Sequence, residues 1–253
     1  MPKHSFDVIV IGSGAAGFSA VEAASGVGAR VCLIEQAKLG GECPNEACVP
    51  SKALLASARA YRAAQETKPL GVVCGSLSYQ FEDVMKYRDR VVEHMTGGNR
   101  YEELLKNMNA TAVRGQAMLE DDHTVVIGPD RYEAKALVLA TGSEDVVPEI
   151  PGLKEIYFWR WRDALSKKRQ LKSMAILGGG PVGCEIATLY ASFGTRVVLI
   201  EPGVHVLPHA DAECAELIEA RLTSMGVQVV TGATITEIVD GRGGVYGVPV
   251  SYT

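Results

Sequence analysis

The pattern of hydrophobic and polar positions repeats once along the chain. Residues 7–35 begin with an apolar run, pass through a glycine turn into an alanine-rich helix, and end with a second apolar run that closes at Glu35. Residues 173–201 repeat this order and close at Glu201. Short apolar runs that alternate with a helical period predict buried parallel strands, so each copy is expected to form one βαβ unit.

The rest of the chain shows weaker helical and strand periods. Helices are predicted at 51–65 and at 81–107, with an interruption at Gly97 and Gly98. The other predicted segments are strands at about 112–119, 124–127 and 136–140, a connector at 148–172 rich in turn residues, a helix at about 212–225, strands at 227–230 and 234–239, and a hairpin around 241–244.

Each repeat carries a glycine turn with the spacing of a dinucleotide-binding motif. The first turn consists of Gly12, Ser13, Gly14, Ala15, Ala16 and Gly17, and the second of Gly178, Gly179, Gly180, Pro181, Val182 and Gly183. The three glycines of such a motif allow a tight bend, close approach of a pyrophosphate, and close packing of helix on strand. A single copy also fits an ordinary glycine-rich turn, but the strand and helix context and the second copy favour dinucleotide binding.

The acidic residue that closes each repeat indicates which nucleotide is bound. Glu35 is expected to accept hydrogen bonds from ribose hydroxyls. Glu201 suits the 2'-hydroxyl of NAD and repels a 2'-phosphate, and residues 202–204 supply no arginine to neutralise one. The sequence therefore predicts NADH rather than NADPH at the second turn.

Two cysteines five positions apart, Cys43 and Cys48, follow the first repeat. On a regular helix their spacing exceeds the usual reach of a disulfide, so pairing requires a distorted turn. A helix beginning near Ser51 would favour a thiolate at Cys48. Two unrelated thiols and a metal site are the alternatives, although two cysteines alone are too few ligands for a metal, and no metal is expected.

Composition and charge exclude several classes of protein. The chain has 253 residues, of which 47% are hydrophobic and 22% charged, with a formal net charge of -5. This composition indicates a folded protein with no broad positive surface for nucleic acid or anionic lipid. Six cysteines are too few for a secreted disulfide framework. With no segment typical of a signal peptide or a membrane span, a cytoplasmic protein is expected.

The linked motifs resemble the class I pyridine nucleotide-disulfide oxidoreductases, flavoproteins that include dihydrolipoyl dehydrogenase, glutathione reductase and mercuric reductase. The resemblance rests on both glycine turns, the segment from Gly40 to Lys52, the sequence Ala140-Thr141-Gly142-Ser143, and Ile150-Pro151-Gly152. It implies an α/β fold with two Rossmann-like dinucleotide-binding domains of the three-layer ββα type. Residues 1–150 would form an FAD-binding domain and 151–253 a truncated NAD-binding domain, without the C-terminal dimerisation domain.

The resemblance also implies roles for individual residues. Cys43 would be the interchange thiol, Cys48 the thiol beside the flavin, and Lys52 and Glu185 an ion pair next to the flavin ring. The remaining FAD-binding residues would be Gly12, Ser13, Gly14, Ala15, Ala16, Gly17, Glu35, Gln36, Gly41, Glu42, Gln116, Ala117, Ala140, Thr141 and Gly142. The NAD-binding residues would be Gly178, Gly180, Pro181, Val182, Gly183 and Glu201.

The sequence departs from the family pattern at several places. Glu42 and Ala47 precede the two cysteines where the family commonly has a small residue and a glycine, and Pro181 replaces a gating tyrosine. None of the five histidines is followed by a glutamate five positions later, so the acid–base dyad of the disulfide-reducing members is missing.

Three functions follow from these observations. The first is an FAD-dependent, NADH-linked oxidoreductase that acts on a small or protein-bound disulfide or dithiol, from a parent protein expected to be a homodimer. The second is a catalytically silent nucleotide-binding fragment. The third is a flavin-dependent NADH oxidase or diaphorase that does not use the thiols.

Overall fold

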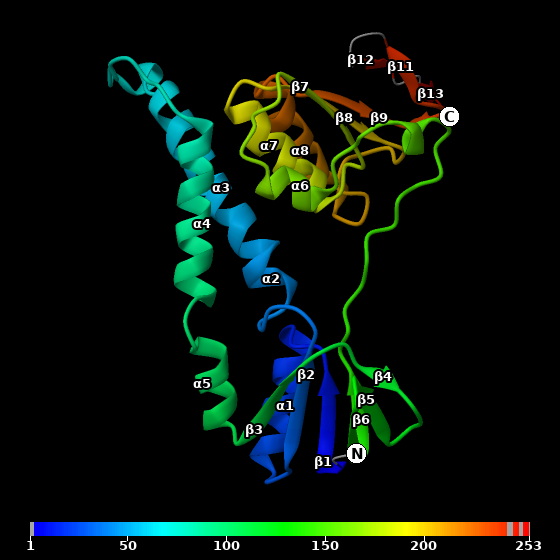
Figure 1. Ribbon diagram of the computed structural model, residues 1–253. Helices are drawn as coiled ribbons and strands as arrows, with labels where there is room; N and C mark the ends of the chain where they lie inside the picture. Colours follow the sequence, from blue (N-terminus) through cyan, green and yellow to red (C-terminus); the bar gives the residue numbers. More distant parts are fainter. Residues whose placement is uncertain (1–2, 242–244, 248–249, 253) are drawn as a thin grey trace. The chain divides into compact units, whose positions relative to one another are not determined.

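The computed structural model describes residues 3–241, 245–247 and 250–252 (Figure 1). The chain divides into two compact units. The first unit combines Met1–Pro50 with Arg90–Asp145, and the second combines Ser51–Asp89 with Val146–Thr253. The domain boundary at residue 150 implied by the family resemblance stays a prediction. In the part of the chain described, no helix is both long and apolar enough to cross a membrane.

The first unit is built on a six-stranded sheet of order β3-β2-β1-β6-β5-β4. Strand β1 is parallel to both β2 and β6, and β2 is parallel to β3, whereas β4, β5 and β6 are joined by antiparallel pairing. The elements are β1 (Lys3–Ile11), α1 (Ala15–Gly26), β2 (Val31–Glu35), α2 (Glu42–Asn45), α5 (Arg100–Asn107), β3 (Ala110–Arg114), β4 (Met118–Leu119), β5 (Thr124–Ile127) and β6 (Asp130–Leu139).

Both faces of this sheet are buried. On β1, Val10 packs in one core cluster with Val21 of α1 and Leu105 of α5, whereas Ile9 packs in a second cluster with Val125 of β5. Successive residues of a strand point to opposite faces, so burial on both faces requires an uninterrupted apolar run. This explains why the sequence from Val8 to Ile11 is continuously hydrophobic rather than alternating.

The second unit contains a three-stranded parallel sheet of order β7-β8-β9. Its elements include η1 (Lys68–Leu70), η2 (Leu153–Glu155), α6 (Trp161–Ser166), β7 (Ser173–Leu177), α7 (Pro181–Ser192), β8 (Arg196–Glu201), α8 (Ala212–Ser224), β9 (Gln228–Thr231), β10 (Ala233–Ile235), β11 (Val239–Gly241), β12 (Val245–Gly247) and β13 (Val250–Tyr252). Helices α3 (Cys48–Gln65) and α4 (Phe81–Thr96) pass from one unit to the other.

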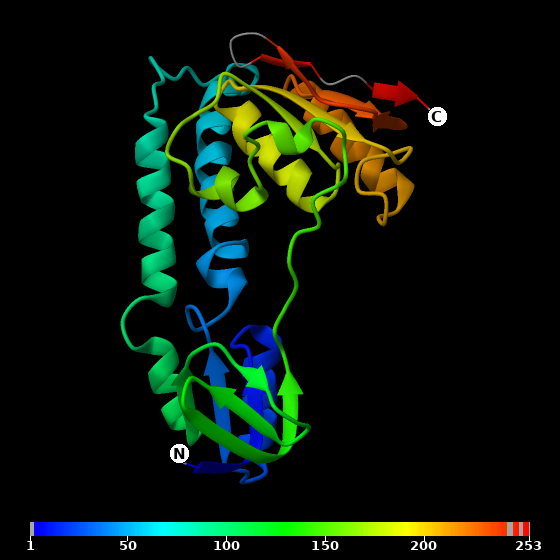
Figure 2. The same ribbon diagram turned by 45° about the vertical axis from the view of Figure 1, so that its right-hand side comes forward.

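In the second unit α3 and the first half of α4 lie side by side (Figure 2). Their buried residues Leu54 and Met85 belong to the same core cluster as Tyr190 of α7. The Tyr190 hydroxyl donates to the Ala164 carbonyl oxygen at 2.9 Å, and burial raises the pKa of this phenol. The helical pair 51–65 and 81–89 therefore shares a core with the second repeat.

The observed elements confirm the mixed α/β fold with two βαβ repeats, but several predicted boundaries were wrong. Helix α3 begins at Cys48 rather than Ser51, and the connector 148–172 contains η2 and α6. The predicted strand 112–119 is divided at Gly115, whose φ is +156° and where a Cβ would lie 2.3 Å from the Ile127 side chain. The predicted hairpin is confirmed by antiparallel pairing of β11 with β12, and its turn lies outside the described residues.

Candidate functional site

The first glycine turn has a backbone that requires glycine at two positions. Gly12 has a φ of +101°, and a Cβ there would lie 2.2 Å from the Ala140 carbonyl oxygen. A Cβ at Gly17 would lie 1.9 Å from the Gly12 carbonyl oxygen. A Cβ at Gly14 would meet nothing within 4 Å. The turn is therefore tight on its inner side and open at Gly14, where a phosphate group has room to approach the start of α1.

Glu35, at the end of β2, is hydrogen-bonded back to this turn. Its carboxylate accepts from the Ser13 amide at 2.9 Å, the Ser13 hydroxyl at 2.6 Å and the Ala37 amide at 2.7 Å. Burial acts to raise the pKa of Glu35, but these hydrogen bonds and one from the Gln36 amide outweigh it and lower the pKa below the usual value. The carboxylate is thus held in its charged form, and its role toward a ribose stays a prediction.

The cysteine segment rests directly on the first turn. A Cβ at Gly41 would lie 2.5 Å from the Gly14 Cα, and the Gly40 amide donates to the Ser13 hydroxyl at 3.2 Å. Two residues further, the short helix α2 carries Cys43, and α3 begins with Cys48; both side chains are exposed. The break between α2 and α3 is the departure from regular helix that their pairing was predicted to require.

Tyr101, on α5, is a residue of this site that the sequence did not reveal. Its ring packs beneath Gly40, where a Cβ would lie 2.6 Å from the hydroxyl oxygen, and contacts Phe18 with 5.3 Å between ring centroids. Burial, and then the negative charge of a Cys43 thiolate, raise the pKa of Tyr101, while Arg100 acts in the opposite direction. Because Tyr101 is far from Gly40 in sequence, no local pattern marked it.

The other predicted cofactor residues of the first unit lie at the ends of neighbouring strands. The Gly115 amide donates to the Glu35 carbonyl oxygen at 2.9 Å, which places Gln116 and Ala117 just beyond the end of β2. The Ala140 amide donates to the Ile11 carbonyl oxygen at 2.8 Å, immediately before Thr141 and Gly142. The carboxyl ends of parallel strands are the usual place for a ligand in such a sheet.

The second glycine turn repeats the first in backbone and in its acidic contact. Gly178 has a φ of +104°, and a Cβ at Gly183 would lie 2.0 Å from the Gly178 carbonyl oxygen. The buried Glu201 carboxylate accepts from the Gly179 amide at 2.7 Å and from the Gly203 amide at 2.8 Å. A carboxylate has about four acceptor positions, so Glu201 retains capacity for a further donor.

Two groups hold the Gly179 carbonyl oxygen. The Leu207 amide donates to it at 2.8 Å, and the Cys184 thiol donates to it at 3.3 Å. Burial, with smaller contributions from the Glu201 and Glu185 carboxylates, raises the pKa of the Cys184 thiol to about 11. Leu207 has a φ of +52°, an unusual conformation for a branched side chain.

The predicted ion pair of the second unit is formed. The Lys52 ammonium lies 2.5 Å from the Glu185 carboxylate, and the pair joins α3 to α7. The exposed fractions of the two side chains are 62% and 33%. Solvent at such exposure screens the attraction, so the pair contributes little to stability by itself. Pro181 and Val182 of the second glycine turn are exposed in the first turn of α7, and their role toward a nucleotide stays a prediction.

Comparison with known proteins identifies the family. The family model for pyridine nucleotide-disulphide oxidoreductase matches residues 6–250. The chain belongs to this family. Dihydrolipoyl dehydrogenase of Acholeplasma laidlawii is 32% identical over 94% of this chain and 72% of its own length. Mercuric reductase of Staphylococcus aureus is 30% identical over 92% of this chain and 42% of its own length.

Solved structures support the same assignment. The HOCl-induced flavoprotein disulfide reductase RclA from Escherichia coli superposes with a TM-score of 0.76 at 26% identity, covering 97% of this chain and 55% of that protein. The chain also covers 48% of dihydrolipoyl dehydrogenase of Geobacillus stearothermophilus, at 35% identity. It therefore spans about half the length of several relatives, and the resemblance seen in the sequence is confirmed at the level of the family.

Proposed function

We propose that this chain is the nucleotide-binding part of a flavoprotein disulfide oxidoreductase that takes electrons from NADH and delivers them through FAD to a Cys43–Cys48 disulfide. One observation carries the proposal: the contact of Gly41 on Gly14, which holds the cysteine segment against the first glycine turn. Without that contact the cysteines and the turn would be two separate features of the sequence.

The first turn suits FAD on three grounds. The space at Gly14 is open, the first amides of α1 have no acceptor within the helix, and Glu35 is kept ionised by its hydrogen bonds. The proposed FAD-binding set is completed by Ser13, Ala15, Ala16, Gln36 and the residues after β3 and β6. When bound, FAD would supply the two-electron chemistry that accepts hydride from a nicotinamide and reduces a disulfide.

The second turn is the proposed NADH site. Gly178, Gly180 and Gly183 give a backbone that a pyrophosphate can approach, and Glu201 presents a carboxylate where an adenosine ribose is expected. Two consecutive residues, Pro181 and Val182, are exposed at the start of α7 and would border the nicotinamide. We expect a 2'-phosphate to be rejected by the Glu201 charge.

The cysteines have distinct proposed roles. Cys43, exposed on α2, would attack the substrate disulfide after two electrons have reduced the Cys43–Cys48 bond to two sulfhydryl groups. Cys48 opens α3, so its sulfur lies at the positive end of the helix dipole, and Lys52 lies one turn later on the same face. Cys48 is proposed to be the sulfur that contacts the flavin. The substrate is proposed to be a disulfide or dithiol, and the full-length parent a homodimer.

Anaerobic reduction of the purified, FAD-loaded chain tests this proposal. One equivalent of NADH should leave the disulfide reduced and the flavin oxidised, and should produce a long-wavelength band from a thiolate in contact with the oxidised flavin. The band should vanish in Cys48→Ser and persist in Cys214→Ser, a control at an exposed cysteine on α8. A flavin-loaded protein that is reduced by NADH without the band would refute the use of the thiols and leave a diaphorase.

A second measurement separates failure of the flavin site from failure of the nucleotide site. FAD binding and NADH binding are each followed by fluorescence titration. A chain that binds NADH but never FAD would contradict the proposed function and leave a nucleotide-binding fragment.

A further inference from the structure

A pocket of about 520 Å³ lies within the second unit, between α3, α7 and α8. Its apolar wall includes Leu55 of α3, Ile218 of α8, and Met225, which directly follows α8. Three arginines from two helices line it, Arg59 and Arg62 on α3 and Arg221 on α8. The pocket therefore combines an apolar wall with a concentration of positive charge.

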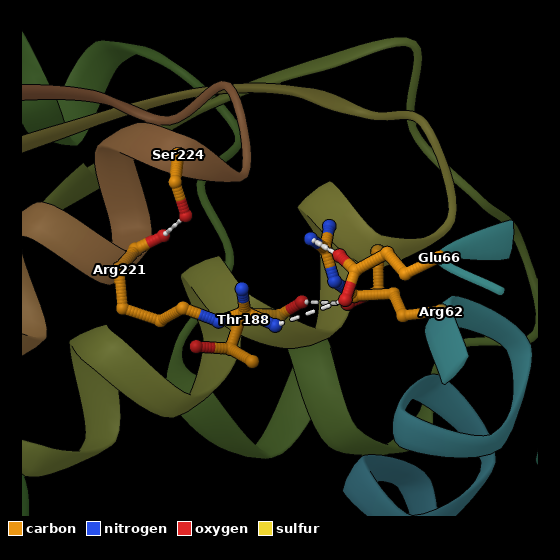
Figure 3. Close-up of polar contacts among 6 residues, drawn as sticks. Arg62, Glu66, Thr188, Arg221 and Ser224 are labelled. Atoms are coloured by element: carbon orange, nitrogen blue, oxygen red, sulfur yellow. Dashed lines mark hydrogen bonds and ion pairs between the residues drawn. The ribbon is translucent and has the colours of Figure 1, made fainter. Parts of the chain in front are cut away.

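The carboxylate of Glu66 does not neutralise these three arginines. Glu66 forms ion pairs with Arg62 and, at 3.6 Å, with Arg221 (Figure 3). Figure 3 shows the Arg221 side chain extending from α8 past Thr188 of α7 towards Glu66. Arg59 adds a third, exposed guanidinium to the same wall. The other carboxylate of the pocket lining, Glu185, pairs with Lys52, so three guanidinium groups against two carboxylates leave a net positive charge in the lining.

Arg62 has an unsatisfied donor here. Its side chain is 16% exposed, and its Nε is buried with no hydrogen-bond partner among the described residues. A buried donor without an acceptor costs free energy, more so when it belongs to a charged group. Because the Nε has almost no accessible surface, an anionic group bound in the pocket would pair with the terminal nitrogens of this guanidinium instead.

The pocket also adjoins the second glycine turn. Cys184 and Leu207, which line it, are the two residues that hold the Gly179 carbonyl oxygen. Strained backbone such as that of Leu207 clusters at ligand sites. The part of the pocket wall formed by Cys184 and Leu207 is thus directly joined to the second glycine turn.

We propose that this pocket binds a small amphipathic anion, an aromatic or aliphatic body that carries one phosphate group. The phosphate pairs with the guanidinium groups of Arg59 and Arg62, and the body packs against Leu55, Ile218 and Met225. Arginine suits this role because its planar fork matches phosphate geometry. Glu66 occupies part of the anion position and so limits the affinity. The pocket adjoins the proposed FAD and NADH sites, since Pro181 and Glu185 also line it, but the arginines proposed to bind the phosphate belong to neither of those sites.

Isothermal titration calorimetry of the full chain with phenyl phosphate tests the proposal. Inorganic phosphate, with the charge alone, and phenol, with the ring alone, should each bind at least tenfold more weakly. Arg59→Gln, at an exposed position, should weaken phenyl phosphate binding about tenfold, whereas Arg169→Gln, an exposed arginine outside the pocket, should leave it unchanged.

Glu66→Gln should change the affinity for phenyl phosphate in the opposite direction. Removing this carboxylate frees two arginines, so the affinity for phenyl phosphate should rise at least fivefold. A folding defect would lower the affinity instead, and circular dichroism melting checks each variant for such a defect. The proposal is overturned if Arg59→Gln and Glu66→Gln both bind within twofold of the unchanged chain, or if inorganic phosphate binds as tightly as phenyl phosphate.

Discussion

The two glycine turns of this chain have nearly the same backbone but different surroundings. The first glycine has a φ of +101° at Gly12 and +104° at Gly178. A Cβ on the last glycine of the turn would lie 1.9 Å (Gly17) or 2.0 Å (Gly183) from the carbonyl oxygen of that first glycine. Two short sequences that share only their glycines and their period thus reach the same local geometry. The turn is therefore a local property of the strand, glycines and helix.

The surroundings of the two turns differ because the neighbouring strands differ. In the first unit β1 is paired on both sides, and Ala140, at the end of β6, lies against Gly12. In the second unit β7 pairs with β8 alone among the described strands, and a Cβ at Gly178 would meet nothing within 4 Å. Sequence alone would rank the two glycines as equivalent, whereas the structure makes one far less replaceable.

The second residue of the turn, Ser13 in one and Gly179 in the other, also differs. Ser13 supplies a hydroxyl that donates to Glu35 and accepts from the Gly40 amide, so it ties the turn to the cysteine segment. Its counterpart, Gly179, has no side chain, and Leu207 and Cys184 hold its carbonyl oxygen instead. The first turn is stabilised by a side chain within the motif, and the second by residues that follow it.

The largest expected effect separates Gly12 from Gly178. Gly12→Ala combines a positive φ with overlap against backbone, and we expect it to destabilise the chain by about 3 kcal/mol or more. Gly178→Ala carries the positive φ alone and should cost about 1–2 kcal/mol. Urea unfolding followed by far-UV circular dichroism measures both. Equal losses would show that β6 does not constrain the first turn.

Glu35→Gln should have an intermediate effect. It removes the charge that accepts three hydrogen bonds, and about 1–2 kcal/mol is expected after allowance for partial exposure. Because the pKa of Glu35 is lowered on folding, its contribution is fully present above the usual value of 4.5 and is lost as the pH falls through the folded pKa. Unfolding of both proteins from about pH 7 to pH 3 should therefore show converging stabilities at the acid end, and a constant difference would contradict this account.

Ser13→Ala should cost about 1 kcal/mol, the usual size of a lost hydrogen bond to a partly buried group. The change makes the first turn resemble the second, which lacks a side chain at this position. Hydrogen exchange of the 40–48 segment is the sharper measurement, since the Gly40 amide loses its acceptor. Faster exchange there, with exchange at β7 unchanged, is expected; equal exchange in both proteins would show that the hydroxyl does not hold the cysteine segment.

The smallest effect concerns Asp7, which lies five positions before Gly12 as Ser173 lies before Gly178. Asp7 pairs with Lys135 at 2.8 Å and with Arg30 at 3.4 Å, and hydrogen bonds to these residues lower its pKa from 3.8 to about 2. A lowered pKa means that the advantage of Asp7 over Asp7→Asn is present above pH 3.8 and is lost as the pH falls toward 2. Carboxyl titration by NMR checks the value, and a midpoint near 3.8 would show that the pairs do not form in solution.

Local sequence was sufficient to predict the two βαβ repeats, both glycine turns and most helices. Gly12, Gly17, Gly178 and Gly183 were identified from spacing because a short turn fixes its own backbone. Tyr101 was missed, since its contact with Gly40 joins two segments about sixty residues apart. The start of α3 was predicted three residues too late: Cys48, Val49 and Pro50 already belong to the helix, and proline is tolerated in the first turn of a helix.

Local sequence was enough to predict where each glycine turn bends and which acidic residue closes each repeat, because these features depend on neighbours within about thirty positions. The tertiary structure decided which strand lies against Gly12, which ring lies under Gly40, and that three arginines from two helices line one pocket. Those contacts depend on how distant segments pack, and packing is governed by the burial of surface and charge over the whole unit rather than by any local period.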